Sequence, residues 1–375
     1  MKFERRVTVY SFVLTCFVIW LHAGESLLTG IPGQIAVPGF FIMSGYLFFR
    51  HLPHDAPQEV PAAPGESSGV RADCEPCRPR AHLAAGRTAP GDGTEQGTAR
   101  TENTAFAVIF RKLRSRVRTL LVPYLLWNMI YFLIYLVFGK ASLSEAPRAV
   151  FLYSCNPVFW YLWQLLLITA LTPLLYLVLR RKVPGVLFLS AVFVLAVLNG
   201  SLPVHYCNED ALFYYSLGAF SALCYRDAVE KPQDDSGRKL LSRQFAISLA
   251  VFLLSGILET ALSMPYRLAG TVLQRAFGAV LIWFLIEGAG QFIVSEDDGS
   301  LPSFMELTFF IYATHYMVIR AVWALEGALH LGESAAANII TYLLMPAFCI
   351  AAACGLHRVL RKFAPRVLLV LTGGR

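Results

Sequence analysis

The sequence predicts an all-α fold: a polytopic integral membrane bundle of about ten transmembrane helices with a long disordered cytoplasmic loop. The 375-residue chain is 56% hydrophobic and 15% charged, whereas a soluble domain typically carries about 25% charged residues. Apolar runs of about 16–23 residues recur along it, each long enough to cross a hydrocarbon core of about 30 Å. Basic residues gather beside alternate ends of these runs, which is the positive-inside pattern of membrane proteins.

The apolar runs define the predicted spans in chain order. They cover residues 6–24, 35–50, 118–138, 158–180, 183–200, 211–226, 244–263, 274–294, 303–324 and 336–358. Lys2, Arg5 and Arg6 precede the first span, so both termini of a chain with an even number of spans are expected in the cytoplasm. The net charge of +7 arises largely from such flanking residues, so no nucleic-acid partner is expected, whereas membrane lipid is.

One segment differs in kind from the spans. Residues 51–104 are rich in Pro, Gly, Ala, Glu and Thr, and a segment with so few large apolar residues is expected to be disordered. Its Cys74 and Cys77 form a single CxxC without a second ligand pair, so no metal site is predicted. The expected domains are a transmembrane domain (1–50 and 105–363), this cytoplasmic insertion (51–104) and a cytoplasmic tail (364–375).

His22 closes the first apolar run, which has no charged residue from Val7 to Leu21. An ionisable residue at the end of a span is a functional candidate by default, although it can also anchor the helix at the interface. Helix rise places His22 roughly 24 Å from Arg6. On the same scale His315 and Glu259 also reach the outer half of the bundle, while Glu287 is expected near mid-membrane.

Together the two histidines indicate a polar cavity in which a neutral imidazole removes a proton from an incoming hydroxyl. The chain has no GxSxG elbow, P-loop, zincin motif or Rossmann glycine pattern. Direct attack of an acceptor hydroxyl on an activated acyl group, with histidine as general base, fits best. His22 and His315 are therefore the candidate catalytic residues. The candidate substrate-binding residues are Ser44, Tyr46, Tyr312, Trp160 and Glu259.

The basic stretch from Phe106 to Arg118 leads directly into the third span. It can be an interfacial helix held on anionic lipid. It can also receive the phosphates of a cytoplasmic nucleotide-bearing donor, because guanidinium groups pair well with phosphate. The candidate donor-binding residues are Arg111, Arg114, Arg116 and Arg118.

Several motifs resemble the bacterial membrane acyltransferase-3 family, whose members O-acylate cell-surface sugars. They are Val18-Ile-Trp-Leu-His22, Val37-Pro-Gly-Phe-Phe-Ile-Met-Ser-Gly45-Tyr46, Arg116-Val-Arg-Thr-Leu-Leu-Val-Pro123-Tyr124, Trp160-Tyr-Leu and Phe310-Ile-Tyr312-Ala-Thr-His315. The resemblance covers nearly the whole chain except 51–104. Family members commonly carry an arginine eleven residues before the first histidine, where this chain has Ser11.

The resemblance implies a ten-span core in a bacterial inner (plasma) membrane, with His22 as the essential base. It implies a cytoplasmic acyl-CoA donor, with acetyl-CoA expected, no bound cofactor, and a surface glycan or lipid-linked acceptor on the outer side. Two other classes stay open. One is a polysaccharide-precursor transporter or flippase that uses Glu287 and Glu259 as a proton relay. The other is a membrane sensor whose 51–104 loop recruits a partner.

Overall fold

The computed structural model describes residues 3–24, 30–52, 93–198, 209–230, 235–264, 266–293, 301–330 and 334–374, and these ranges contain helices and no strand. The α-helices are α1 (Phe3–His22), α2 (Gly30–Phe49), α3 (Gly93–Arg116), α4 (Val122–Val137), α5 (Ala146–Phe151), α6 (Trp160–Ala170), α7 (Thr172–Leu179), α8 (Lys182–Leu198), α9 (Glu209–Cys224), α10 (Arg226–Glu230), α11 (Asp235–Ala261), α12 (Tyr266–Ile293), α13 (Thr308–Ala328), α14 (Ala335–Phe363) and α15 (Pro365–Leu371). The expected all-α class is confirmed for this part of the chain.

Four helical segments are long and apolar enough to cross a membrane, and a fifth is a helix pair bent by 62°. The four are Thr104–Val137, Arg243–Ala261, Tyr266–Gly288 and Ala336–Phe363, and the bent pair is Pro157–Ala170 with Thr172–Leu179. Two further apolar helices, Gly33–Phe49 and Lys182–Leu198, are shorter. The helices α1 and α13 are long enough but not apolar enough, because they carry the histidines and arginines. The count of ten spans therefore stays a prediction.

The basic stretch is continuous with the span that follows it. The helix α3 passes through a π-helical turn, Val117–Leu121, directly into α4. Residues 93–104, which were expected to be disordered with the rest of the insertion, lie in α3, so that boundary was wrong. The remainder of the expected loop, 53–92 with Cys74 and Cys77, lies outside the described residues.

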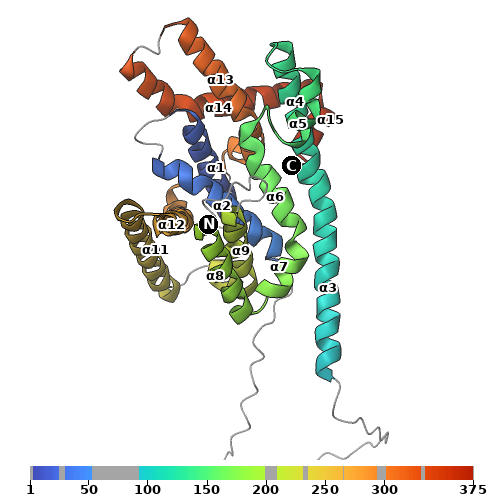
Figure 1. Cartoon of the computed structure of the whole chain (residues 1–375), viewed down its shortest axis with the longest axis vertical. Helices are drawn as coiled ribbons and strands as arrows, with labels where there is room; N and C mark the ends of the chain where they lie inside the picture. The colour runs from blue at the N-terminus through green and yellow to red at the C-terminus, as the bar shows by residue number, and fades with distance from the viewer. Residues whose placement is uncertain are drawn as a thin grey trace, which may run out of the picture.

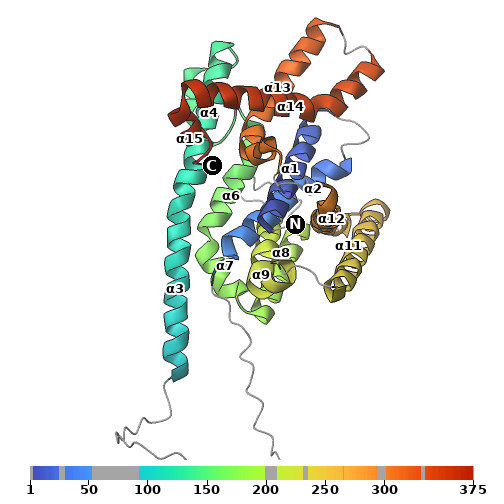
Figure 2. The same ribbon diagram turned by 180° about the vertical axis from the view of Figure 1, so that it is seen from behind.

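The helices surround a centre formed by α1 and α2 (Figures 1 and 2). The long α3 projects beyond the bundle at one end, while α13 and α14 lie at the other. The hairpin of α11 and α12 sits at the side, with α12 packed against α1 and α2 and α11 packed on α12. Of the expected cytoplasmic tail, α15 is docked, because the Trp127 indole donates to the carbonyl oxygen of Leu371 at 3.1 Å.

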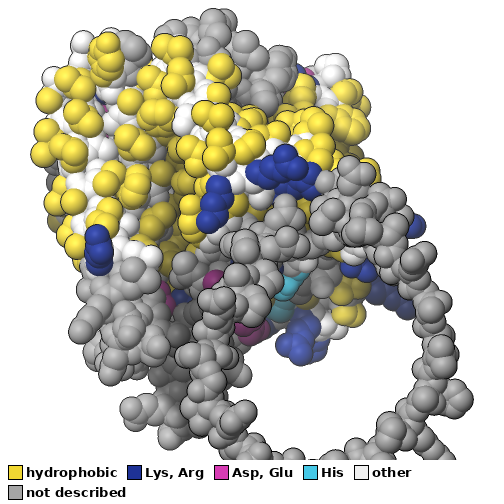
Figure 3. Space-filling model, turned by 90° about the horizontal axis from the view of Figure 1, so that it is seen from below, with side chains coloured by type: hydrophobic (Ala, Val, Ile, Leu, Met, Phe, Trp, Pro, Cys, Tyr) yellow, Lys and Arg dark blue, Asp and Glu magenta, His cyan; other side chains and the backbone are white. Residues whose placement is uncertain are grey.

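Apolar side chains cover much of the exterior, as lipid contact requires. On α11 the exposed residues include Ile247, Leu253, Leu254 and Ile257. Seen from the end toward which α3 projects, the described surface is mostly hydrophobic, with Lys and Arg side chains in a few groups (Figure 3). These features and the apolar spans make the chain a membrane protein.

Two glycines allow α2 and α9 to touch backbone to backbone. A Cβ atom on Gly45 would lie 2.1 Å from the carbonyl oxygen of Tyr215, and one on Gly218 would lie 1.9 Å from that of Ile42. Small residues permit such close approach between membrane helices. The crossing fixes the position of Ser44, next to Gly45, against α6.

Tyrosine hydroxyls link the helices by donating to backbone carbonyls. Tyr10 reaches Ala279 at 3.0 Å, and Tyr131 reaches Ala313 at 3.0 Å. Tyr312 reaches Val158 at 2.6 Å. Each bond satisfies a phenol inside the apolar core, where an unpaired polar group is costly.

Gly45→Ala is expected to destabilise the bundle by about 1–3 kcal/mol, because the added methyl group has no space against α9. Thermal unfolding in detergent, followed by loss of monodisperse protein, measures the effect. Gly355→Ala is the matched control, since a Cβ there meets no atom within 4 Å. Equal melting temperatures for the Gly45 and Gly355 variants would contradict the tight crossing.

Candidate active site

The two predicted catalytic histidines lie side by side. The ring centroids of His22, at the end of α1, and His315, in α13, are 5.6 Å apart. His315 is fully buried, with 0% of its surface exposed. Its Nδ1 lies 2.5 Å from the carbonyl oxygen of Tyr312, and a carbonyl can only accept, so Nδ1 carries the proton of the neutral ring. Its Nε2 is then an unprotonated acceptor, and it has no hydrogen-bond partner among the described residues.

A cavity of about 260 Å³ lies on the N-terminal side of this pair along both helices. We call it the hydroxyl-lined cavity, because Ser11 and Thr15 of α1 and Thr308 and Tyr312 of α13 contribute to its wall. The order is the same on the two helices, with the cavity residues first and the histidine after them. The cavity therefore lies between the predicted cytoplasmic end of α1 and the histidine pair.

Ser44 and Tyr161 close another side of the hydroxyl-lined cavity. The Ser44 hydroxyl lies 3.3 Å from the Tyr161 hydroxyl, and both residues line the space. Tyr161 also packs edge-on against the Tyr312 ring at 6.0 Å. The structure thus brings the predicted residues Ser44 and Tyr312 together. They line the cavity on the N-terminal side of the histidine pair and do not surround the histidines.

Of the four predicted donor-binding arginines, only Arg116 lines the cavity. Arg111, Arg114 and Arg118 are exposed on the same helical stretch. Arg116 directly precedes the π-helical turn, and such turns are frequent at functional sites. Ser11 of α1 lines the same cavity. The guanidinium group in this cavity is therefore that of Arg116, which belongs to α3, and α1 contributes a serine at position 11.

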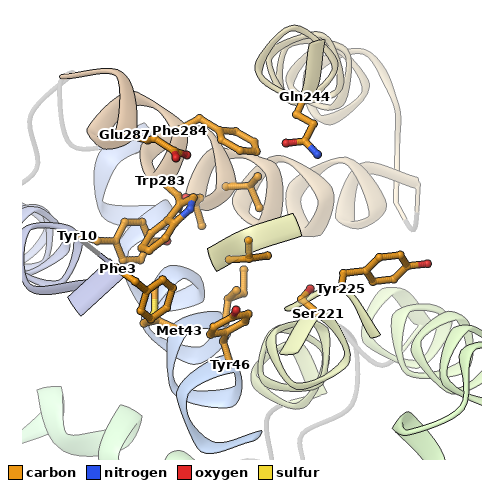
Figure 4. A pocket seen from close by; sticks show the side chains of 14 residues that line it. Phe3, Tyr10, Met43, Tyr46, Ser221, Tyr225, Gln244, Trp283, Phe284 and Glu287 are labelled. Atoms are coloured by element: carbon orange, nitrogen blue, oxygen red, sulfur yellow. Dashed lines mark hydrogen bonds between the residues drawn. The ribbon is translucent and has the colours of Figure 1, made fainter. Parts of the chain in front are cut away.

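Tyr46 does not lie with the histidines. It faces a second space of about 310 Å³ on another side of α2, the apolar cavity. Figure 4 shows Tyr46 and Met43 on one side of it, Trp283 and Glu287 on another, and Gln244 reaching in from α11. The Tyr46 hydroxyl donates to Glu230 at 2.9 Å. Sequence reasoning missed this bond, because Glu230 lies between two predicted spans and not within one.

The expected mid-membrane position of Glu287 was wrong. Glu287 pairs with Arg6 at 2.8 Å, and Arg6 lies near the N-terminal end of α1. The helix α12 begins at Tyr266, eight residues before the predicted start of the span, so Glu287 falls near its far end. Arg6 also lies over the Trp283 ring, with 5.1 Å between the guanidinium carbon and the ring centroid.

Trp160 and Glu259 also lie elsewhere. Trp160 lines a third space of about 250 Å³, the Trp160 cavity, together with Leu21, the neighbour of His22. Glu259 belongs to α11, which packs chiefly against α12. The structure therefore does not bring Glu259 to the histidines, because α12 stands between them.

Sequence reasoning missed Tyr161, Ser11 and Thr15 as lining residues. Tyr161 directly follows Trp160 in the aromatic run, and on a helix such neighbours point about 100° apart. Ser11 and Thr15 lie five and nine residues after Arg6 in a mostly apolar run. Their spacing of four residues puts them on one helix face and could have identified them.

The class of protein follows from comparison with known protein families. The family model described as "Acyltransferase domain", the membrane acyltransferase-3 family, matches residues 12–358. The chain belongs to this family and is an acyltransferase. The match ends within α14 and covers every residue that lines the hydroxyl-lined cavity except Ser11.

A characterised relative gives a more particular likeness. The chain is 25% identical over 285 residues to the succinoglycan biosynthesis protein ExoH of Rhizobium meliloti (strain 1021), covering 71% of this chain and 73% of the relative. The relative's name places it in polysaccharide biosynthesis. No solved structure matches the chain.

Glu287→Gln is expected to destabilise the protein by about 3 kcal/mol, because it leaves the Arg6 charge in the core without its counter-charge. Arg6 is 4% exposed and Glu287 18% exposed at the side chain. Glu4→Gln is the matched control: Glu4 pairs with Arg50 at 3.5 Å and is 73% exposed, so a loss below about 1 kcal/mol is expected. Thermal unfolding in detergent compares them, and equal losses would contradict the structural role of the Arg6–Glu287 pair.

Proposed function

We propose that this membrane acyltransferase moves an acyl group, with acetyl as the first candidate, from a cytoplasmic acyl-CoA to a hydroxyl of an extracytoplasmic glycan. The observation that carries the proposal is the His22–His315 pair, which lies beyond the hydroxyl-lined cavity along both α1 and α13. Histidine is suited to this work because its pKa lies near neutral pH. The likeness to a polysaccharide biosynthesis protein favours a glycan acceptor.

In this proposal His22 is the base and His315 its partner. The acceptor hydroxyl gives its proton to His22 as its oxygen attacks the thioester carbon, and the carbon–sulfur bond then breaks. The departing CoA thiolate takes this proton from His22, so an ester, free CoA and neutral His22 result. His22 is only half buried and can meet an acceptor. In the proposed reaction the buried Nε2 of His315, which has no partner among the described residues, accepts a hydrogen bond from the His22 ring.

The hydroxyl-lined cavity gives the donor a route toward the histidines. A cytoplasmic donor and a base near the outer face are separated by most of the membrane, and this space lies between them along α1. Arg116 supplies its cationic group, which attracts an anionic donor and can pair with phosphate. The hydroxyls of Ser44 and Tyr161 offer hydrogen bonds to the amides of the donor arm.

The transporter alternative depends on a titratable carboxylate at mid-membrane. Glu287 instead forms an ion pair with Arg6 at the end of α12, and Glu259 faces none of the three cavities described above. These positions favour acyl transfer over a proton relay.

His22→Ala is expected to abolish acylation of the surface glycan by at least 100-fold, because general base catalysis contributes about 10²–10⁴. Ester-linked acyl groups on surface glycans are quantified in cells with equal membrane abundance of each variant. His330→Ala is the matched control, since His330 is exposed beyond the end of α13. Unchanged ester in the His22 variant would refute the assignment of the base.

Arg116→Gln is expected to raise the KM for acyl-CoA about ten-fold, because a charge-assisted hydrogen bond is worth about 1.5–3 kcal/mol. Arg114→Gln, two residues away on the same helix and exposed, is expected to change it less than two-fold. Initial rates in membrane vesicles at varied acyl-CoA measure both values. If the two variants raise KM equally, the cationic surface of α3 attracts the donor and the cavity does not.

A further inference from the structure

The Trp160 cavity contains an ion pair that neither the motifs nor the proposed chemistry uses. Asp210 of α9 and Arg275 of α12 approach to 3.6 Å, and each side chain is 30% exposed. Both line the cavity with Trp160 and Gln34. The Arg275 Nε is buried and has no hydrogen-bond partner among the described residues. Because the Arg275 side chain is 30% exposed, its terminal guanidinium N–H groups can donate to a ligand in the cavity.

The cavity lies at the level of the histidines. Leu21 of its wall is joined to His22, and consecutive Cα atoms are 3.8 Å apart. The remaining wall comes from the early parts of α2, α6, α9 and α12. Phe41 separates it from the hydroxyl-lined cavity, with its ring centroid 6.4 Å from Trp160 and 4.7 Å from Tyr161. The two cavities thus lie on either side of one aromatic wall.

We infer that the Trp160 cavity is a carbohydrate subsite that holds one sugar ring of the acceptor, so that a hydroxyl of the adjoining ring meets His22. This inference rests on the proposed function. The carboxylate of Asp210 accepts from a sugar hydroxyl, the Arg275 guanidinium donates to its neighbour, and the Gln34 amide does both. The indole of Trp160 offers an apolar face to the C–H face of the ring.

The charges favour a neutral polyol over an anion. Asp210 and Arg275 cancel each other, so the cavity has no net charge to attract a free phosphate or carboxylate. Adjacent sugar hydroxyls both donate and accept, which matches an acceptor and a donor 3.6 Å apart. The volume of the Trp160 cavity, about 250 Å³, is smaller than the roughly 300–1,000 Å³ of sites for drug-sized ligands. The cavity therefore has room for one sugar ring and not for a whole oligosaccharide repeat.

Binding without turnover tests the subsite independently of catalysis. The probe is the de-esterified oligosaccharide repeat released from the surface polysaccharide of the source strain, titrated into the full-length protein in nanodiscs without acyl-CoA. Asp210→Asn and Arg275→Gln are each expected to raise its Kd about ten-fold, the loss of one charge-assisted contact. Trp160→Leu removes the aromatic face against the ring and is expected to raise it about three-fold. Arg267→Gln, an exposed arginine two turns earlier on α12, is expected to leave Kd unchanged.

Gln34→Ala gives a milder second variant in case an ion-pair variant fails to fold, with a Kd rise of at least three-fold expected. Kd values unaffected in the cavity variants, or wild-type protein that does not bind the repeat, would overturn the subsite. Neither result depends on acyl transfer. If the cavity variants weaken binding while His22→Ala leaves glycan esters intact, the subsite stands and the proposed role of His22 fails.

Discussion

The contact between His22 and His315 depends on α1 and α13 running side by side in the same direction. Ser11 and Thr15 face Thr308 and Tyr312 across the hydroxyl-lined cavity before the histidines meet. The hydrogen bond from His315 Nδ1 to the Tyr312 carbonyl fixes one tautomer and leaves Nε2 as an acceptor. Any displacement of α13 along α1 would separate the two histidine rings and would at the same time change the shape of the hydroxyl-lined cavity.

Several contacts hold α1 and α13 in this register. The Arg6–Glu287 pair and the Tyr10 hydrogen bond to Ala279 join α1 to α12 at two levels. The Tyr312 hydroxyl joins α13 to the segment before α6. The glycine crossing of α2 and α9 then sets Ser44 against Tyr161. Polar groups inside an apolar bundle thus serve both as structural links and as the lining of the site.

Helix rise predicted that His22 and His315 lie at one depth, and the structure brings their rings together. The same argument put Glu259 at that depth, but its helix α11 packs chiefly against α12. Ser44 and Tyr312 were predicted to bind the substrate and Arg116 the donor. The structure places all three on the hydroxyl-lined cavity, and their roles stay predictions. The all-α class followed from composition. The fold class and the shared level of the two histidines could be predicted because they depend on apolar run length and on position along a helix.

The rotation of each helix about its own axis, and the residue at which each helix begins, could not be predicted in the same way. Tyr46 and Trp160 face cavities other than the hydroxyl-lined cavity. The direction in which a side chain points from its helix depends on how the helices pack, and the sequence does not give that packing. Glu287 was misplaced because α12 starts eight residues earlier than its apolar run indicates. Asp210 and Arg275 are 65 residues apart in sequence, and no local pattern indicates that they meet.

The central claim is that an acyl group passes from a cytoplasmic donor through the bundle to an acceptor at the His22 end. The most direct measurement uses oriented proteoliposomes with acyl-CoA only on the side of the α1 N-terminus and the de-esterified glycan repeat only on the other. Labelled acyl groups on the glycan are then counted. The account predicts ester on the far-side glycan with wild-type protein and none with His22→Ala. Ester formed only when both substrates share one side, or retained in the His22 variant, would contradict it.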